Sequence, residues 1–532
     1  MPVLTAPEIS GLRAGEDVNM LTKNDWLEER RCALQAALDA QKTKAERNRL
    51  GQFATPTQLA REMLAYGLSL LPRGEAVRFF DPAIGTGSFY SALRAACQDR
   101  TIAWARGFEV DAHYGQPALD LWRGTPLKIM LGDFTRQTPP AAEAERANLL
   151  ICNPPYVRHH HLSGEEKRRL QEAAHRAAHV EISGLAGLYC YFMALSHDWV
   201  SGGGVAGWLI PSEFMDANYG KALKAYLLRE VTLLRIHRFD PNDVQFDDAL
   251  VSSAVVWFKK QKPAANHEVT FSYGGTIQKP ALIKNVSVQD LERTEKWTRF
   301  PKQDAEAIHG GCRLGDLFAI KRGLATGDNS FFILDEKRAR SLSIPPQFLR
   351  PILPSARYIK SDEIMADAQG VPLLDKRLFL LDCDLPEDEV QRHHPALWAY
   401  LQTGLERAAQ RSLCRLRRRW YAQERRAAAP ILCTYIGRSD HDGMPFRFLL
   451  NHSAAIATNV YLMLYPLPPL AEQLRRNPDL LRILWQQLKA TARETLLGHG
   501  RVYGGGMHKL EPKELANIPA DALAAVAGLN EK

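Results

Sequence analysis

Short runs of Val, Ile, Leu and Phe alternate with longer stretches of helical periodicity between residues 77 and 258. Apolar runs bounded by turn residues are typical of strands buried on both faces, and the stretches between them are typical of covering helices. Strands are expected at 77–80, 103–108, 129–134, 148–152, 205–210, 231–238 and 251–258. The alternation predicts an α/β fold with a doubly wound, Rossmann-like sheet, and the last two strands predict an antiparallel hairpin that closes it.

The chain on either side of this alternation follows other patterns. Residues 26–49 combine alanines and charges at helical spacing, which predicts a single helix. Thr55 is a candidate N-cap for the next helix, with Pro56 at the first helical position. A lysine-rich stretch before Pro263 marks a composition shift, after which the alternation stops. We therefore expect a helical lead-in, an α/β domain and a mixed α+β domain, at residues 1–50, 51–262 and 263–532.

Acidic residues stand at the ends of three successive predicted strands: Asp81, Glu109 and Asp133. Asp81 opens the stretch Asp-Pro-Ala-Ile-Gly-Thr-Gly-Ser-Phe, in which two glycines let a ligand approach the backbone closely. A strand, a glycine turn and a helix form the first half of a nucleotide-binding unit. A carboxylate at the strand end would repel a pyrophosphate, but it suits a cationic ligand with a free amino group. Glu109 lies near the place where such folds bind ribose hydroxyls.

The sequence Asn153-Pro154-Pro155-Tyr156 follows an apolar run that ends at Cys152. Neither proline has a backbone N–H, so the chain must leave the sheet there in a rigid turn. Open α/β sheets bind their ligands at the carboxyl ends of strands, where this turn lies. The turn presents an amide, free carbonyls and an aromatic ring. This combination predicts a site that grips a planar group bearing an NH2.

Composition and charge narrow the class of protein without naming a substrate. The 532 residues are 45% hydrophobic and 24% charged, with no apolar run of membrane-spanning length and no signal-peptide pattern. The 8 cysteines are scattered without paired spacing, which favours a reducing cytoplasm and argues against structural zinc. Three adjacent histidines at 159–161 cannot all face one ion, so no metal is expected. A net charge of +8 permits a polyanionic partner.

An arginine-dense stretch lies in the carboxyl-terminal half. Eight arginines fall between Arg407 and Arg426, around Trp420 and Tyr421. Two interpretations stay open: a solvated helix face, or arginines that contact phosphates and bases.

Taken in order, these motifs resemble those of the γ-class adenine-N6 DNA methyltransferases, and most of all the Eco57I/TaqI-like modification enzymes. The motifs that carry the resemblance are Thr55-Pro56, residues 81–89, Phe108-Glu109-Val110-Asp111, Gly132-Asp133-Phe134 and Asn153–Tyr156. The resemblance covers most of residues 50–260. Further segments, 315–318 together with 322–329, and 505–512, resemble pieces of that family's target-recognition domain. Asn-Pro-Pro-Tyr alone is shared with protein-glutamine and some RNA guanine methyltransferases, so the order of the motifs is the more specific signal.

The resemblance implies a class I methyltransferase fold for residues 51–262 and a DNA target-recognition domain for 263–532. It implies that S-adenosylmethionine is held by Thr55, Pro56, Asp81, Ala83, Gly85, Gly87, Glu109, Asp133, Phe134 and Asn153. The implied catalytic residues are Asn153, Pro154, Pro155 and Tyr156, with Asn153 and the Pro154 carbonyl accepting hydrogen bonds from the target amino group. Tyr156 and Phe246 would stack on the two faces of the target base. The implied contacts to double-stranded DNA are Arg322, Thr326, Arg417, Arg418 and Lys509.

The function expected from this resemblance is sequence-specific methylation of adenine N6, protecting host DNA from a restriction endonuclease encoded separately. Methylation of a protein glutamine is an alternative, but the long segment after residue 262 argues against it. A DNA-binding relative that has lost catalysis is another, but the intact acidic strand ends and Asn153 argue against that. The stretch before Gly51 is too short for a nuclease fold, so we expect methylation without cleavage.

Overall fold

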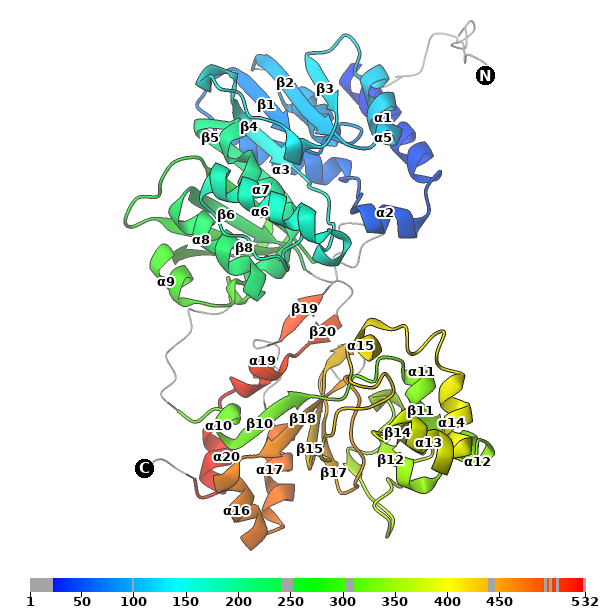
Figure 1. Ribbon diagram of the computed structural model, residues 1–532. Coiled ribbons are helices and arrows are strands. Elements are labelled where there is room, and N and C mark those ends of the chain that lie inside the picture. The colour runs from blue at the N-terminus through cyan, green and yellow to red at the C-terminus, as the bar shows by residue number, and fades with distance from the viewer. Residues whose placement is uncertain are drawn as a thin grey trace, which may run out of the picture. The chain divides into compact units, whose positions relative to one another are not determined.

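The computed structural model describes residues 23–97, 100–240, 252–302, 311–438, 445–491, 495–496, 500–503 and 507–529. The chain divides into two compact units, Met1–Ala305 and Glu306–Lys532 (Figure 1). The first unit therefore extends beyond residue 262, where the composition shift predicted a boundary. Two more strands follow that point and belong to the same sheet. Among the described residues, no helix is long and apolar enough to span a membrane.

The first unit is built on one nine-stranded sheet with the order β3-β2-β1-β4-β5-β7-β6-β8-β9. Strands β1 to β5 run parallel, and β7 pairs antiparallel with both β5 and β6. The predicted antiparallel hairpin is thus present, but β8 and β9 continue the sheet past it. The strands are β1 Val77–Asp81, β2 Ile102–Glu109, β3 Leu127–Leu131, β4 Ala147–Cys152, β5 Val200–Pro211, β6 Thr232–Arg238, β7 Ser253–Lys259, β8 Glu268–Gly275 and β9 Pro280–Ser287.

Helices cover both faces of this sheet, as a doubly wound α/β fold requires. One layer comprises α1 Lys23–Asp39, α3 Thr57–Ser69, α4 Ser88–Ala96 and α5 Ala112–Leu121. The opposite layer comprises α6 Gly164–Ala178, α7 Leu188–Leu195, α8 Lys221–Arg229 and α9 Val288–Arg293. Neighbouring apolar residues of a strand serve opposite layers, because side chains alternate along it: Leu149 packs with the first layer and Leu150 with the second.

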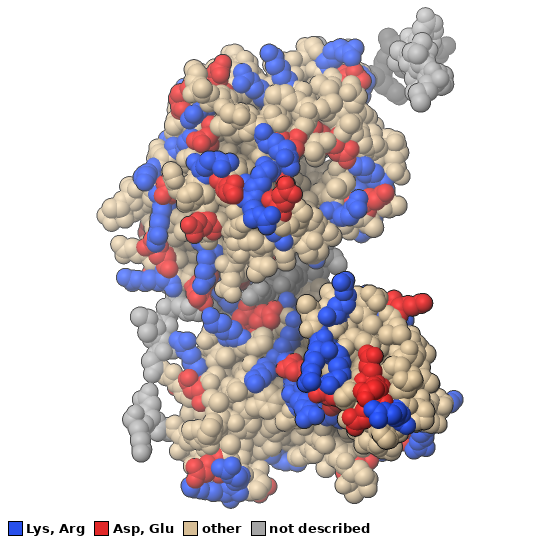
Figure 2. Space-filling model, viewed as in Figure 1, with Lys and Arg blue, Asp and Glu red and all other residues tan. Residues whose placement is uncertain are grey.

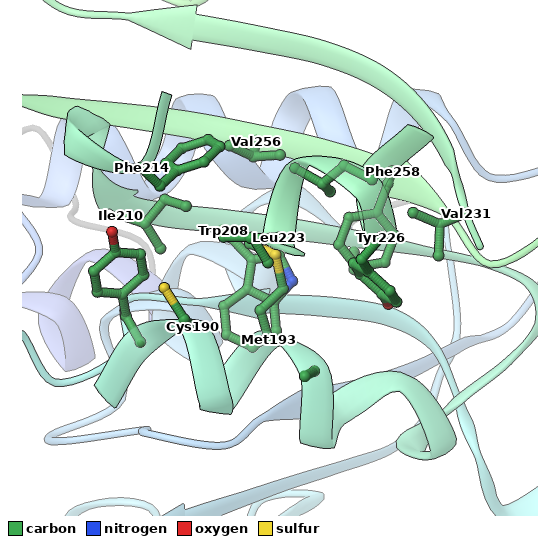
Figure 3. Close-up of a cluster of buried hydrophobic side chains, with 14 of the residues drawn as sticks. Cys190, Met193, Trp208, Ile210, Phe214, Leu223, Tyr226, Val231, Val256 and Phe258 are labelled. Carbon is green, nitrogen blue, oxygen red and sulfur yellow. The ribbon is translucent and has the colours of Figure 1, made fainter. Parts of the chain in front are cut away.

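The core between the sheet and the layer of α6 to α9 shows how the covering helices are held (Figure 3). Met193 of α7 and Tyr226 of α8 meet Trp208 of β5 and Phe258 of β7, and all four side chains are buried. Large aromatic side chains of this kind contribute most of the buried apolar area. The expected α/β fold, with a doubly wound sheet and an antiparallel hairpin, is confirmed.

The amino-terminal segment forms two helices, α1 and α2 (Lys44–Leu50), where one helix was predicted. Thr43 separates them: its hydroxyl accepts from the Glu46 backbone, and the Glu46 carboxylate accepts from the Thr43 backbone. This reciprocal capping box satisfies the free donors of a helix start, and so it favours a new helix over continuation.

The second unit is a mixed α+β assembly, as predicted, with sheets ordered β10-β18-β15-β17-β13, β11-β14-β12 and β16-β20-β19. Its strands are β10 Phe318–Arg322, β11 Ile333–Asp335, β12 Leu349–Ile352, β13 Glu363–Ile364, β14 Leu378–Leu381, β15 Ile431–Thr434, β16 Ile436–Arg438, β17 Phe448–Asn451, β18 Tyr461–Pro466, β19 Arg501–Tyr503 and β20 Met507–Lys509. Its helices are α10 Leu314–Leu317, α11 Asn329–Phe332, α12 Glu336–Ser341, α13 Glu387–His393, α14 Pro395–Gln402, α15 Ser412–Arg415, α16 Pro468–Arg476, α17 Leu480–Lys489, α19 Pro512–Ala516 and α20 Asp521–Val526.

Candidate active site

The candidate site lies at the carboxyl ends of three neighbouring strands in the first unit. Strand β1 lies between β2 and β4, so the chain changes direction across the sheet at β1. Asp81 is the last residue of β1, Glu109 is the last residue of β2, and Asn153 directly follows β4. Crevices at such a switch point are where open α/β sheets bind ligands. Three residues predicted from separate motifs are therefore brought to one edge.

Asp81 is almost completely buried, with 1% of its surface exposed. Burial raises the pKa of Asp81 to about 7, and the nearby Glu109 charge adds to the rise. The backbone N–H of Ala83, 3.0 Å from Oδ1, and the thiol of Cys152 act in the opposite direction. A buried carboxylate of this kind is stabilised by any cation that reaches it.

Glu109 links the ends of two loops. Its Oε2 accepts from the Gly85 backbone N–H at 3.0 Å, and its Oε1 accepts from the Asp111 backbone N–H at 2.8 Å. Burial raises the pKa of Glu109, while these two hydrogen bonds lower it. Gly85 has a φ of +55°, which favours glycine, and a Cβ added there would meet nothing within 4 Å. The glycine turn thus leaves open space above a fixed backbone.

The side chain of Asn153 is held by its amide nitrogen. Nδ2 donates to the carbonyl of Phe53 at 2.9 Å and to the hydroxyl of Thr55 at 3.1 Å. Oδ1 is buried and has no hydrogen-bond partner in the described part of the chain. Buried acceptors are rarely left without a donor, so an unpaired one in a crevice indicates a place for a ligand donor.

The turn of Asn153 to Tyr156 is supported by the segment before α3. A Cβ added to Gly51, whose φ is +66°, would lie 2.2 Å from the Tyr156 nitrogen, and the Gly51 carbonyl accepts from that nitrogen at 3.2 Å. The Tyr156 ring packs 5.6 Å from the Phe53 ring, and its hydroxyl donates to the Leu209 carbonyl. The turn is thus fixed by the backbone of Gly51, the ring of Phe53 and the carbonyl of Leu209.

Thr55 does not cap α3 as predicted. Pro56 occupies the N-cap position, and the Thr55 hydroxyl instead accepts from Asn153. Local capping preference could not reveal this, because the partner lies nearly a hundred residues away. Thr55 is still at the site, in a different role.

An ion pair in α1 also reaches the site, and sequence reasoning missed it. Arg31, 2% exposed, donates to both Glu28 carboxylate oxygens at 2.7 Å and to the Thr86 hydroxyl at 3.3 Å. Burial opposes ionisation of Glu28, but the hydrogen bonds and charge around it outweigh burial and lower its pKa to about 2. Charges three residues apart on a helix usually indicate a solvated pair, so no local pattern points to their burial.

The sequence is similar to two family models and to several known proteins. Residues 99–245 match the family described as Eco57I restriction-modification methylase, and residues 303–530 match the C-terminal domain of type II methyltransferase M.Eco57I. The type II methyltransferase M.XamI of Xanthomonas campestris pv. amaranthicola is 28% identical over 482 residues, covering 89% of this chain and 86% of the relative. M.AccI of Acinetobacter calcoaceticus is 26% identical over 487 residues, covering 88% and 85%.

The chain belongs to the Eco57I family of restriction-modification methylases. The match to these type II methyltransferases extends over most of their length, which supports a DNA methyltransferase function. The fold of the type IIL restriction-modification enzyme MmeI, solved in complex with DNA, is also similar, with a TM-score of 0.55 and 13% identity over 95% of this chain and 76% of MmeI.

Asp133 and Phe134, expected at the cofactor, lie just beyond β3. Asp133 caps the short helix Phe134–Arg136, where its Oδ1 accepts from the backbone and the hydroxyl of Thr135. The Phe134 ring is 2% exposed and packs against Phe80 and Trp199 in the core. The ring is therefore not available to a ligand in this conformation. Phe246, expected against the target base, lies outside the described residues.

Of the residues expected to contact DNA in this methylase, Arg322 and Lys509 lie beside one aromatic ring, whereas Thr326 is buried. The guanidinium of Arg322 and the amine of Lys509 lie 4.0 and 5.1 Å from the centre of the Tyr435 ring, so two distant motifs meet there. Thr326 is 1% exposed and donates to Asn329, so its side chain holds the loop and is not available for direct DNA contact in this conformation.

Arg417 and Arg418 differ in their contacts. Arg417 donates to the Ala325 carbonyl at 3.0 Å and lies over the Phe332 ring, and burial lowers its pKa. Its guanidinium is therefore engaged by the protein itself, contrary to the expected role at DNA. Arg418 is exposed and has no hydrogen bond or ion pair with any described residue.

Proposed function

We propose that this methylase transfers a methyl group from S-adenosylmethionine to the N6 amino group of adenine in double-stranded DNA. The observation that carries the proposal is the buried, unpartnered Oδ1 of Asn153. It lies at the strand edge that also carries the carboxyl groups of Asp81 and Glu109, and its amide nitrogen is already engaged. An acceptor in that position suits a ligand that brings an N–H.

The residues at the three strand ends fit the cofactor. Asp81 is a buried carboxylate that favours a cation, and the open space above Gly85 admits a ligand close to the backbone. We assign Asp81, Ala83, Gly85 and Gly87 to the methionine portion and Glu109 to the ribose hydroxyls. Thr55 and Pro56 support this site, and Asp133 with the backbone at Phe134 is assigned to the adenine portion. When bound, S-adenosylmethionine supplies an electrophilic sulfonium methyl group.

The residues of the turn act on the target nitrogen. The N6 lone pair of adenine is delocalised into the ring, so the amino group is a poor nucleophile. Oδ1 of Asn153 and the Pro154 carbonyl accept hydrogen bonds from its two N–H groups, which favours a pyramidal nitrogen and stabilises the positive charge that develops there. This is electrostatic stabilisation by prepositioned groups, with acceptors in place of the donors of an oxyanion hole.

The target base must leave the duplex to reach this turn. Unstacking costs a few kcal/mol, which aromatic contacts offset in part. We assign that contact to Tyr156, whose ring orientation is fixed by Phe53 and Leu209, and to Phe246. Pro155 keeps the turn rigid between the two functions.

The cellular role that follows is modification of a specific DNA sequence within a restriction–modification system. Its cytoplasmic partner would be a cognate restriction endonuclease encoded separately. Methylation of a protein glutamine is the alternative, since the same turn accepts any planar amino group. The match of residues 303–530 to the C-terminal domain of a type II methyltransferase favours DNA.

The test is to incubate the protein with labelled S-adenosylmethionine and either plasmid DNA or a protein extract, and to sequence the DNA for modified bases. We expect label in DNA and N6-methyladenine at one sequence. Asn153→Ala should lower the turnover rate about a hundredfold or more, as for loss of one prepositioned hydrogen-bonding group, while duplex binding persists. Asn285→Ala, at an exposed strand position, is the control. Label in protein alone, or a modified cytosine, would overturn the assignment.

A further inference from the structure

The eight arginines between Arg407 and Arg426 fall into two equal groups. Four are engaged by the second unit itself: Arg407 with Asp328, Arg417 with Ala325, Arg419 with Asp384, and Arg426 with Glu424. The other four are exposed, and their side chains make no hydrogen bond or ion pair with the part of the chain that the structure describes: Arg411, Arg415, Arg418 and Arg425. An uncompensated group of this kind attracts a polyanion.

Two leucines protrude among these free arginines. Leu413 is 40% exposed and Leu416 is 85% exposed, so nearly the whole Leu416 side chain projects from the surface. A single exposed leucine needs no explanation. Here, however, Leu416 lies directly after Arg415 and two residues before Arg418, so an apolar tip is flanked by unpaired cations. Figure 2 shows Lys and Arg side chains gathered in the region of α15, the helix that Leu416 directly follows.

The turn that carries Leu416 is anchored from beneath. Cys414 is fully buried, and its Sγ lies so close to Gly327 that a Cβ there would be 2.5 Å away. Arg417 donates to the Ala325 carbonyl and covers Phe332. The residues between and beside these anchors are the ones that project. The position of Leu416 is therefore fixed by buried contacts. Because the segment is already ordered, it would lose little conformational entropy on binding a partner.

We propose that residues 411–418 form a DNA-inserting wedge, in which Leu416 enters a groove of duplex DNA and separates a base step. Arg411, Arg415 and Arg418 hold the flanking phosphates. Apolar side chains that enter between base steps unstack them and kink the duplex, while cations beside them compensate the backbone charge. The inference rests on the proposed function only in that the ligand is duplex DNA.

The experiment uses the full-length protein and a duplex that contains the site mapped by DNA sequencing. 2-Aminopurine, which becomes more fluorescent when it is unstacked, is placed at each position of the site in turn. With wild-type protein we expect enhancement at the target base and at a second step. Leu416→Ala should lose the enhancement at the second step and bind about tenfold more weakly, and Leu416→Met should restore both. Since Leu416 is exposed, the substitutions leave the fold intact.

Two further variants separate the wedge from general electrostatics. Arg418→Ala should reduce the slope of log affinity against log salt concentration by about 1, whereas Leu416→Ala should leave that slope unchanged. Leu373→Ala, 53% exposed and outside the arginine stretch, is the control and should bind normally. Equal affinity and equal fluorescence for Leu416→Ala and wild-type protein would overturn the wedge. Failure of the wild-type protein to bind any duplex would instead overturn the proposed function.

Discussion

The strand-end site of the first unit and the arginine stretch of the second unit were both predicted from short sequence signals. They differ in how well those signals predicted where the side chains lie. At the strand ends, Asp81, Glu109 and Asn153 meet because parallel strands of one sheet end at the same edge. In the arginine stretch, no such geometric rule applies, and half of the arginines bind their own unit. Topology makes a motif informative about position, whereas composition alone does not.

Among the variants that compare the two regions, Asp81→Asn should have the largest effect. The Asp81 carboxylate lies at the strand ends, where the cofactor is proposed to bind. Asp81→Asn should weaken S-adenosylmethionine binding about tenfold to a hundredfold by removing one unit charge from a buried site. Wild-type affinity should also fall as the pH drops through about 7, where the free carboxyl group becomes protonated. Calorimetric titration at pH 6 and pH 8 measures both. Unchanged affinity in the variant would make Asp81 structural.

The same substitution has an opposite effect on stability, which serves as its internal control. A carboxyl group whose pKa is raised in the folded state destabilises the fold once it ionises, so this cost grows between pH 4 and pH 7 and is complete above. Asp81→Asn should therefore be more stable than wild type at pH 8, on the order of a few kcal/mol, and similar near pH 4. Thermal unfolding at the two pH values checks this.

A second test asks whether the support behind the turn is as rigid as the backbone contacts indicate. Gly51→Ala combines a positive φ with a Cβ 2.2 Å from Tyr156, while Gly74→Ala has a similar φ of +77° and nothing within 4 Å. Gly74→Ala should cost about 1 kcal/mol of backbone strain. Gly51→Ala should cost more and also slow methyl transfer. Equal effects in chemical denaturation and activity assays would show that the close approach is unimportant.

The smallest effects should separate the two kinds of arginine. Arg417→Ala should lower the free energy of unfolding by about 1 kcal/mol or more, because it removes a hydrogen bond and the cover of Phe332. Arg418→Ala should leave stability unchanged and weaken duplex binding only a few-fold at low salt. These two variants test directly whether an engaged arginine serves stability and a free one serves DNA binding. If both variants lose DNA affinity equally with no loss of stability, the division into engaged and free arginines is wrong.

Much of the first unit could be predicted, and the failures share a cause. The apolar runs located β1, β2, β4 and β7 to within a few residues, since continuous burial leaves a continuous pattern. The predicted boundary after residue 262 failed because a charged turn between two strands of one sheet has the composition of a linker. Strand β9, the edge strand of the sheet, is largely exposed and carries a weaker apolar pattern.

Long-range partners of polar side chains could not be predicted. Thr55 has the local signature of a cap but binds Asn153, and the burial of Arg31 with Glu28 depends on contact with Thr86. Thr326 and Arg417 stand in motifs assigned to DNA, yet they face inward. A motif identifies a loop, but which side of the loop faces outward depends on packing that a single sequence does not encode locally.

The two hydrogen bonds donated by the Asn153 amide have a consequence for which bases the site can accept. With Nδ2 engaged by Phe53 and Thr55, the amide cannot rotate to offer its NH2 to a ligand. In the proposed function only Oδ1 would face an incoming base, where it would attract a hydrogen and repel a carbonyl oxygen. Guanine and thymine, which carry keto groups at the corresponding ring position, would be refused, while adenine and cytosine would be admitted. Under this proposal the Phe53 carbonyl would set the polarity that the site offers before any base arrives.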